Sequence, residues 1–273
     1  MSMLKFIFLC SILGMDGFAM VTKSNLSQDY KTMFPPITRP LQILDKVSRK
    51  NYVVHEQPHQ LGDLYTHRIR HTIFKLKDGS VLLYNPIAPT EETLHETIQA
   101  FNKAPDHIIV PTNSYEHLSM LPGWVDKFPD AVFWGLPGVD LGKVKIRKNL
   151  IEENLPSNWL DELSFSVLNG SYLLKECFLL HKESKTIFTI DSFSIIGEQH
   201  IGNIMGKWIY EIAAGGLNKP SCGTKLLMID KKQSRKAVLK ALDWDFERAV
   251  TTHGVCPIDD AKNQFKRAFQ FLI

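Results

Sequence analysis

The chain has 273 residues, 44% of them hydrophobic, and its 32 basic and 29 acidic residues give a net charge of +3. This length and composition suit one large globular domain or two small ones, with enough apolar side chains for a core. The nearly balanced charge does not indicate binding to nucleic acid or to an anionic membrane. No apolar run is long enough to predict a transmembrane helix.

The N-terminus has the layout of a secretory signal peptide. Lys5 precedes the apolar run 6–15, and small residues follow up to Ala19. A positive charge, a short apolar stretch and small residues at the cleavage point are the three parts of such a signal. We therefore expect cleavage near Ala19, loss of residues 1–19 and a secretory destination. The alternative is a buried N-terminal helix in a cytoplasmic protein.

Two glycosylation sequons favour the secretory route: Asn25-Leu26-Ser27 and Asn169-Gly170-Ser171. Cleavage would leave three cysteines: Cys177, Cys222 and Cys256. Three cysteines do not make a disulfide framework, so one bridge and no bridge are both compatible with the sequence.

The first elements of the chain form a hairpin after a polar lead-in. Residues 20–60 are polar and interrupted by prolines, so we expect little regular structure there. The segment 64–76 then alternates polar and apolar residues, Asp78-Gly79 is a two-residue turn signal, and 81–84 reads as the return strand. The hairpin opens a domain that we expect to span residues 61–273.

Helices and strands alternate after the hairpin. A helix with Thr90 as N-cap is followed by a strand at 108–110, a helix near 118–128 and a strand at 131–135. This alternation predicts a largely buried sheet covered by helices.

The second half begins with another hairpin and ends with helices. The expected elements are strands at 173–180 and 186–190, a helix at 200–214, a basic helix at 234–242, a strand at 248–252 and a closing helix at 259–272. Together the two halves predict one four-layer α/β domain with a pair of sheets inside helices.

Polar side chains come directly after three of the predicted strands. They are Glu116-His117 after 108–110, Asp191 after 186–190 and His253 after 250–252. Ligands collect at the carboxyl ends of strands in α/β folds, and carboxylates and imidazoles are good zinc or iron ligands. The sequence alone does not show which strand ends are neighbours.

The order of these motifs resembles the metallo-β-lactamase-like hydrolase superfamily, and more closely a branch of it known only as a domain of unknown function. The segments that carry the resemblance are Asp78-Gly79-Ser80 with Asn85-Pro86-Ile87, the loop 111–117, Phe188-Thr189-Ile190-Asp191, and Trp244-Asp245-Phe246 through His253-Gly254. The resemblance covers roughly residue 64 to the C-terminus. It implies an αββα sandwich with the site at the sheet edge between its halves.

The chain departs from the superfamily in the signature loop, which reads His-x-His-x-Asp-His. Thr112 and Ser114 stand where two imidazoles belong, and neutral hydroxyls are poor substitutes as zinc ligands. A third histidine is expected before the second hairpin, yet none lies between His117 and His181. The resemblance therefore implies that the first metal position is lost.

The second metal position of the superfamily is nearly complete. Its residues match Glu116, His117, Asp191 and His253, with Glu in place of Asp. The match implies at most one zinc or iron ion, and a chain without metal is equally compatible with the sequence.

Three functions follow, each with an unidentified small molecule as substrate or ligand. The first is an eroded site with weak or no hydrolase activity. The second is an active mononuclear hydrolase of an ester, thioester or lactone, in which Glu116 and Asp191 are the catalytic carboxylates. The third is a non-catalytic secreted binding protein.

Two further residues could contribute to the site. A turn centred between Glu183 and Ser184 would pair Asp191 with Glu176 across the second hairpin, on one face of the sheet. Glu176 is then a further ligand or proton acceptor, or else an edge-strand carboxylate that faces water. Cys256 could be a ligand, a structural thiol or the partner of Cys222.

Overall fold

The computed structural model describes residues 34, 36–61, 63–145, 147–171, 174–213 and 216–273. The expected signal peptide at 1–19 and the sequon at Asn25 lie outside the described residues.

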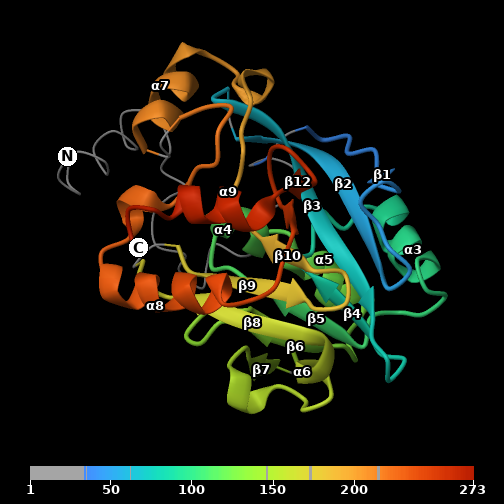
Figure 1. Ribbon diagram of the computed structural model, residues 1–273. Coiled ribbons are helices and arrows are strands. Elements are labelled where there is room, and N and C mark those ends of the chain that lie inside the picture. The colour runs from blue at the N-terminus through green and yellow to red at the C-terminus, as the bar shows by residue number, and fades with distance from the viewer. Residues whose placement is uncertain (1–33, 35, 62, 146, 172–173, 214–215) are drawn as a thin grey trace.

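The first sheet has seven strands in sequential order (Figure 1). They are β1 (Gln42–Ile43), β2 (Tyr52–Leu61), β3 (Tyr65–Lys75), β4 (Val81–Tyr84), β5 (His107–Val110), β6 (Val132–Gly135) and β7 (Arg147–Asn149). Strands β1 to β4 pair antiparallel, and β4 to β7 pair parallel. The carboxyl ends of β4 and β5 therefore lie at the same edge.

The second sheet has five strands in the order β12-β11-β10-β9-β8. They are β8 (Leu163–Leu168), β9 (Glu176–His181), β10 (Thr186–Thr189), β11 (Arg248–Thr251) and β12 (Ile258–Asp259). The pair β10–β11 is parallel and the others are antiparallel.

The helices lie outside the two sheets or between consecutive strands. They are α3 (Glu91–Gln99), α4 (Tyr115–Leu118), α5 (Leu121–Lys127), α6 (Trp159–Glu162), α7 (Ile204–Ala213), α8 (Lys231–Leu242) and α9 (Ala261–Ala268), with short 3-10 turns at Glu152–Asn154, Glu198–His200 and Lys225–Leu227. In Figure 1, α8 and α9 cover the outer side of the second sheet, and α3 and α5 lie by the first. Among the described residues, no helix has both the length and the apolar character needed to cross a membrane.

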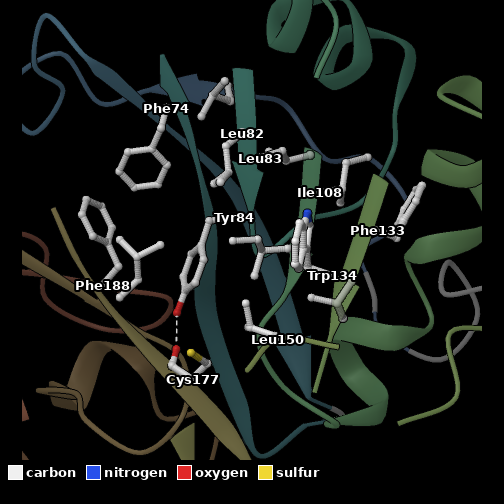
Figure 2. Packing of buried hydrophobic residues seen from close by; sticks show 14 of the residues in the cluster. Phe74, Leu82, Leu83, Tyr84, Ile108, Phe133, Trp134, Leu150, Cys177 and Phe188 are labelled. Atoms are coloured by element: carbon white, nitrogen blue, oxygen red, sulfur yellow. Dashed lines mark hydrogen bonds between the residues drawn. The ribbon is translucent and has the colours of Figure 1, made fainter. Parts of the chain in front are cut away.

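Strand β9 shows how the alternating sequence builds the layers. Cys177 and Leu179 point into the core shared by the two sheets, whereas Phe178 and Leu180 point into the core under α8 and α9. Successive side chains of a strand point to opposite faces, and β9 is buried along its whole length because both of its faces are covered. Figure 2 shows the shared core, where the Tyr84 hydroxyl donates a 2.5 Å hydrogen bond to the Cys177 carbonyl across the sheets.

The arrangement confirms the expected αββα fold, including the hairpin at Asp78-Gly79 and the helix capped by Thr90. The expectation of little regular structure in 20–60 was wrong for its last part, because Tyr52–Leu61 form β2 and pair with β3 along the whole strand. The strand was predicted as a loop because it contains polar residues, such as Gln57, that the fold buries. Pro58 fits there because β1 pairs with β2 only at His55 and Glu56, so that part of β2 has a neighbour on one side.

Candidate metal centre

The carboxyl ends of the strands bring the predicted site residues together. Asp191 follows β10 and His253 follows β11, and these strands are parallel neighbours, whereas Glu116 and His117 lie on α4 after β5. The His253 Nε2 atom is 3.2 Å from Glu116 Oε1 and 3.4 Å from Asp191 Oδ1. The His117 Nε2 atom is 3.8 Å from Asp191 Oδ2. All four side chains thus face one small region.

The atoms that meet in this region are not aligned with one another as hydrogen bonds. Glu116 Oε1, both ring nitrogens of His117 and His253 Nε2 are buried without an aligned partner among the described residues. Ligands at 2.0–2.1 Å from a tetrahedral zinc ion lie about 3.3 Å from each other. Donor atoms of Glu116, His117 and His253 all lie within 4.8 Å of one another, so the donor set fits a transition-metal ion.

The ring of His253 is oriented for ligation through Nε2. Its Nδ1 atom is 2.8 Å from the carbonyl oxygen of Arg68 and donates to it, which leaves Nε2, directed at the carboxylates, as the atom that can bind a cation. Burial lowers the pKa of His253, but Glu116 and Asp191 outweigh it and raise the pKa to about 10 in the metal-free chain. A bound cation would therefore displace a proton from this ring.

The two carboxylates are held in the charged form. Burial raises the pKa of Asp191, yet His117 and His253 outweigh burial and lower it to about 2. Burial acts on Glu116 in the same way, and His59 and His253 hold its pKa well below the usual value. The region therefore offers negative charge to a cation.

Arg70 on β3 fixes the segment that carries His253. Its guanidinium donates to the carbonyl of Thr251 at 2.9 Å and to that of Gly254 at 2.8 Å, and its Nε donates to Glu56 Oε2 at 2.6 Å. Gly254 has φ +74, and a Cβ there would lie 2.3 Å from the Ile195 carbonyl oxygen. The turn therefore needs glycine and is held on both sides.

Glu176 holds the backbone segment that carries Asp191 and does not itself line the site. The register of the second hairpin is the expected one, with Phe188 opposite Leu179. The expectation of a carboxylate facing water was wrong, because Glu176 is buried and accepts hydrogen bonds from the backbone N–H groups of Ile190, Asp191 and Ser192. Burial, with the charge of Asp191, raises the pKa of Glu176 to about 7.

In the signature loop, the hydroxyl of Thr112 hydrogen-bonds to the backbone. Thr112 Oγ1 accepts a 3.1 Å hydrogen bond from the N–H of Ser114. Ser114 precedes the first residue of α4 and makes no side-chain capping bond. Neither residue supplies the nitrogen donor that the superfamily has at its position.

Two histidines that the sequence reading missed come to the same region from the β2–β3 ribbon. His59 and His67 are cross-strand partners, and His59 Nε2 is 2.8 Å from Glu116 Oε1. Donor atoms of His59, His67 and Glu116 also lie within 4.8 Å of one another. The sequence contained a signal: His55 and His59 are four apart, His67 and His71 are four apart, and the pairs are symmetric about the turn.

The cysteines do not contribute ligands to either group of donors. Among the described residues none of the three cysteines is in a disulfide, so the bridge between Cys222 and Cys256 is not formed. Burial raises the pKa of Cys222 to about 12 and also raises that of Cys256, which makes both thiols poor nucleophiles.

Comparison with solved structures places the fold. The metal-soaked Flv1 flavodiiron core from Synechocystis matches with a TM-score of 0.60 and 12% identity over 86% of this chain and 61% of that chain. This chain therefore spans less than two thirds of the flavodiiron core. A metallo-β-lactamase from Pontibacter korlensis matches with a TM-score of 0.57 and 12% identity over 85% and 99% of the two chains. The metallo-β-lactamase FIM-1 from Pseudomonas aeruginosa, in its mono-zinc form, matches with a TM-score of 0.59 and 10% identity over 87% and 96%.

Among curated proteins, none matches the chain in sequence. The sequence model of a domain of unknown function, DUF4336, matches residues 50–207, which is more than half of the chain. The match begins just before β2 and ends within α7, so it includes Glu116, His117 and Asp191 and excludes His253. The chain therefore belongs to the DUF4336 family, and it has the metallo-β-lactamase fold.

Proposed function

We propose that the chain binds one zinc or iron ion through Glu116, His117 and His253 and uses it to hydrolyse an ester, thioester or lactone. The observation that carries this proposal is the convergence of buried donor atoms that are not aligned with one another but surround a common point. Two of the solved neighbours support the choice of metals, since one is a mono-zinc form and another a metal-soaked flavodiiron core.

The arrangement suits catalysis because three protein ligands leave a coordination position open. A transition-metal ion held by these residues would lower the pKa of a bound water and so supply a nucleophile near neutral pH. Asp191 is the most exposed of the four side chains, at 20% against 13% for Glu116, and its carboxylate is ionised. Asp191 is therefore placed to orient a water at the open position, while Glu116 acts as ligand.

A second candidate function follows from the closeness of Asp191 to both imidazoles. Its oxygens are 3.4 Å from His253 Nε2 and 3.8 Å from His117 Nε2, so Asp191 could itself complete a four-coordinate shell. A closed shell is typical of structural zinc and leaves no position for water. The chain would then have an eroded site that holds one metal ion and has weak or no hydrolase activity.

Metal content and activity together separate these functions. The purified chain is loaded with zinc or with iron, analysed for metal, and assayed with an aryl ester, a thioester and a lactone, with His253→Ala as the control. We expect one equivalent of metal and metal-dependent hydrolysis. One equivalent of metal without hydrolysis supports the four-coordinate closed shell. A chain that takes up no metal with either zinc or iron leaves only the function of a non-catalytic binding protein.

We also propose that the chain follows the secretory route, on the basis of the layout of residues 1–19. N-terminal sequencing of the protein from its native host is expected to start near residue 20. An intact Met1 on a cytosolic protein would contradict this assignment.

A further inference from the structure

The group formed by His59, His67 and Glu116 has the spacing of a second metal position. Its three donor atoms lie within 4.8 Å of one another, as do those of Glu116, His117 and His253. Distance alone does not separate a ligand from a hydrogen-bonding neighbour, because a ring nitrogen binds a metal only through a lone pair. Which nitrogen of each ring carries the proton is therefore inferred from the hydrogen-bond partner of the nitrogen that points away from Glu116.

Arg39 holds the other nitrogen of His59. Its Nη1 atom lies 3.2 Å from His59 Nδ1 and 3.0 Å from the carbonyl oxygen of Pro58, and its Nη2 donates to the carbonyl of Phe34. A guanidinium donates and never accepts, so Nδ1 of His59 is the acceptor. The proton of the neutral ring is then on Nε2, the atom that lies 2.8 Å from Glu116 Oε1.

His253 is held in the opposite way. Its Nδ1 faces the carbonyl oxygen of Arg68, so that nitrogen keeps its proton, and Nε2 is the atom that offers a lone pair once a cation displaces its proton. Two imidazoles that both point at Glu116 are thus distinguished by their outer neighbours. The Arg68 carbonyl leaves Nε2 of His253 able to bind a metal ion, whereas the Arg39 guanidinium keeps a proton on Nε2 of His59.

We propose that His59 is a positioning residue and not a metal ligand. Held by Arg39, it keeps a proton on Nε2, which lies 2.8 Å from Glu116 Oε1 at ion-pair distance without hydrogen-bond alignment, and so positions this carboxylate for the ion at His117 and His253. This assignment rests on the metal position proposed above. It also implies that the group of His59, His67 and Glu116 takes no second ion, because the ring offers no lone pair and the guanidinium adds positive charge behind it.

Stacked rings keep His59 in this orientation. Phe34 stacks on it with centroids 5.6 Å apart, and His67 stacks on it at 5.4 Å with the planes only 7° apart. His67 stacks in turn on His253 at 4.2 Å. His59 is fully buried, so its orientation is set by the protein and not by solvent.

The test replaces His59 with two side chains that differ in one property. In His59→Gln the amide NH₂ can still donate to Glu116, and in His59→Leu nothing can donate. Metal stoichiometry, affinity in competition with a chelator, and the visible spectrum of the cobalt(II)-loaded full chain are measured. We expect one equivalent in the wild type and in both variants, with an unchanged cobalt spectrum. Affinity should fall by about 10–100-fold in His59→Leu and be largely restored in His59→Gln, as for other partners that orient a ligand.

A double-mutant cycle with Arg39 tests whether Arg39 acts through His59. Arg39→Met should weaken metal affinity, and the double variant with His59→Leu should bind no more weakly than His59→Leu alone. Arg39→Lys, which keeps a donor, should retain most of the affinity. Additive losses in the double variant would contradict the chain of contacts from Arg39 to Glu116.

The outcomes distinguish this inference from the proposed function. A wild-type chain that binds two equivalents, or a His59→Gln variant that loses an equivalent or changes the cobalt spectrum, overturns the role of His59 and leaves the first metal position standing. A wild-type chain that binds no metal overturns both.

Discussion

At the scale of single residues, the site depends on which atom of each side chain is already occupied. His253 gives its Nδ1 proton to the Arg68 carbonyl, and Glu176 uses its carboxylate on three backbone N–H groups. Of these two residues, only His253 has a donor atom that can still bind a metal ion. The hydrogen bonds made on the side away from the site therefore decide whether a buried polar side chain is a metal ligand or a support.

Glu176 gives the first prediction. In Glu176→Ala the N–H groups of Ile190, Asp191 and Ser192 lose their acceptor inside the protein. Hydrogen bonds to a charged group are worth about 1.5–3 kcal/mol, and unsatisfied buried donors add their desolvation cost. We expect a loss of about 3 kcal/mol in the free energy of unfolding, measured with urea, and slower metal-dependent hydrolysis because Asp191, placed to orient water, is in the released segment. A stability equal to that of the wild type would contradict this role.

The buried pair of His55 and His71 gives a prediction for pH. Their ring nitrogens are 3.0 Å apart, and burial lowers the pKa of His55 from 6.5 to about 4. Because the folded pKa is depressed, the unfolded chain binds the proton more readily between these values, so stability is present above pH 6.5 and is lost as pH falls towards 4.

This pair is tested by comparing urea unfolding at pH 7 and pH 4.5 in the wild type and in His55→Gln. The contribution of His55 across the full pH interval is about 3 kcal/mol, from the shift in its pKa. The variant, which has no proton to gain at this position, should lose less stability on acidification. An equal loss in both proteins would contradict the buried neutral state of His55.

At the scale of elements, the β2–β3 ribbon is as much a part of the site as the strand ends. It supplies His59 and His67 beside Glu116, the Arg68 carbonyl that orients His253, and Arg70, which holds the turn after β11. The ribbon therefore connects the first sheet to the metal position.

Arg70 provides the test at this scale. Removing one partner of a buried ion pair typically costs about 3–5 kcal/mol, because the other charge stays buried. We expect Arg70→Met to lose stability of this order, since the buried Glu56 keeps only the partly exposed Arg68 at 3.6 Å, and to weaken metal binding through the His253 turn. Adding Glu56→Gln should recover part of the stability but not the metal affinity, because the bonds to Thr251 and Gly254 remain absent. Recovery of both would show that the carbonyl contacts are unimportant.

At the scale of the whole molecule, the site lies where two sheets meet, so its geometry depends on their packing. The Tyr84 hydroxyl of the first sheet donates to the Cys177 carbonyl of the second within the buried core shared by the two sheets (Figure 2). In Tyr84→Phe we expect a loss of about 1–3 kcal/mol in unfolding free energy, because the Cys177 carbonyl loses this buried donor. A stability within error of the wild type would contradict a contribution of this bond to sheet packing.

The layered fold could be predicted from the sequence, because apolar alternation identifies most strands. The convergence of Glu116, His117, Asp191 and His253 was implied only by the resemblance to the metallo-β-lactamase-like superfamily, because the strand pattern does not show which strand ends are neighbours. Strand β2 and its histidines could not be recognised in this way, because polar residues such as Gln57 are buried there by partners distant in sequence. The role of His59 depends on its contact with Arg39, 20 residues away, which no local pattern indicates.

The most direct test is a metal titration of the wild-type chain beside two single variants. We predict one equivalent of tightly held zinc or iron in the wild type, one in His59→Gln and none in His253→Ala, with circular dichroism showing that all three are folded. The wild-type result follows from one complete donor group, and the contrast between the variants follows from the lone pair on His253 Nε2 and the proton on His59 Nε2. Two equivalents in the wild type, or metal retained by folded His253→Ala, would contradict the assignment of the site.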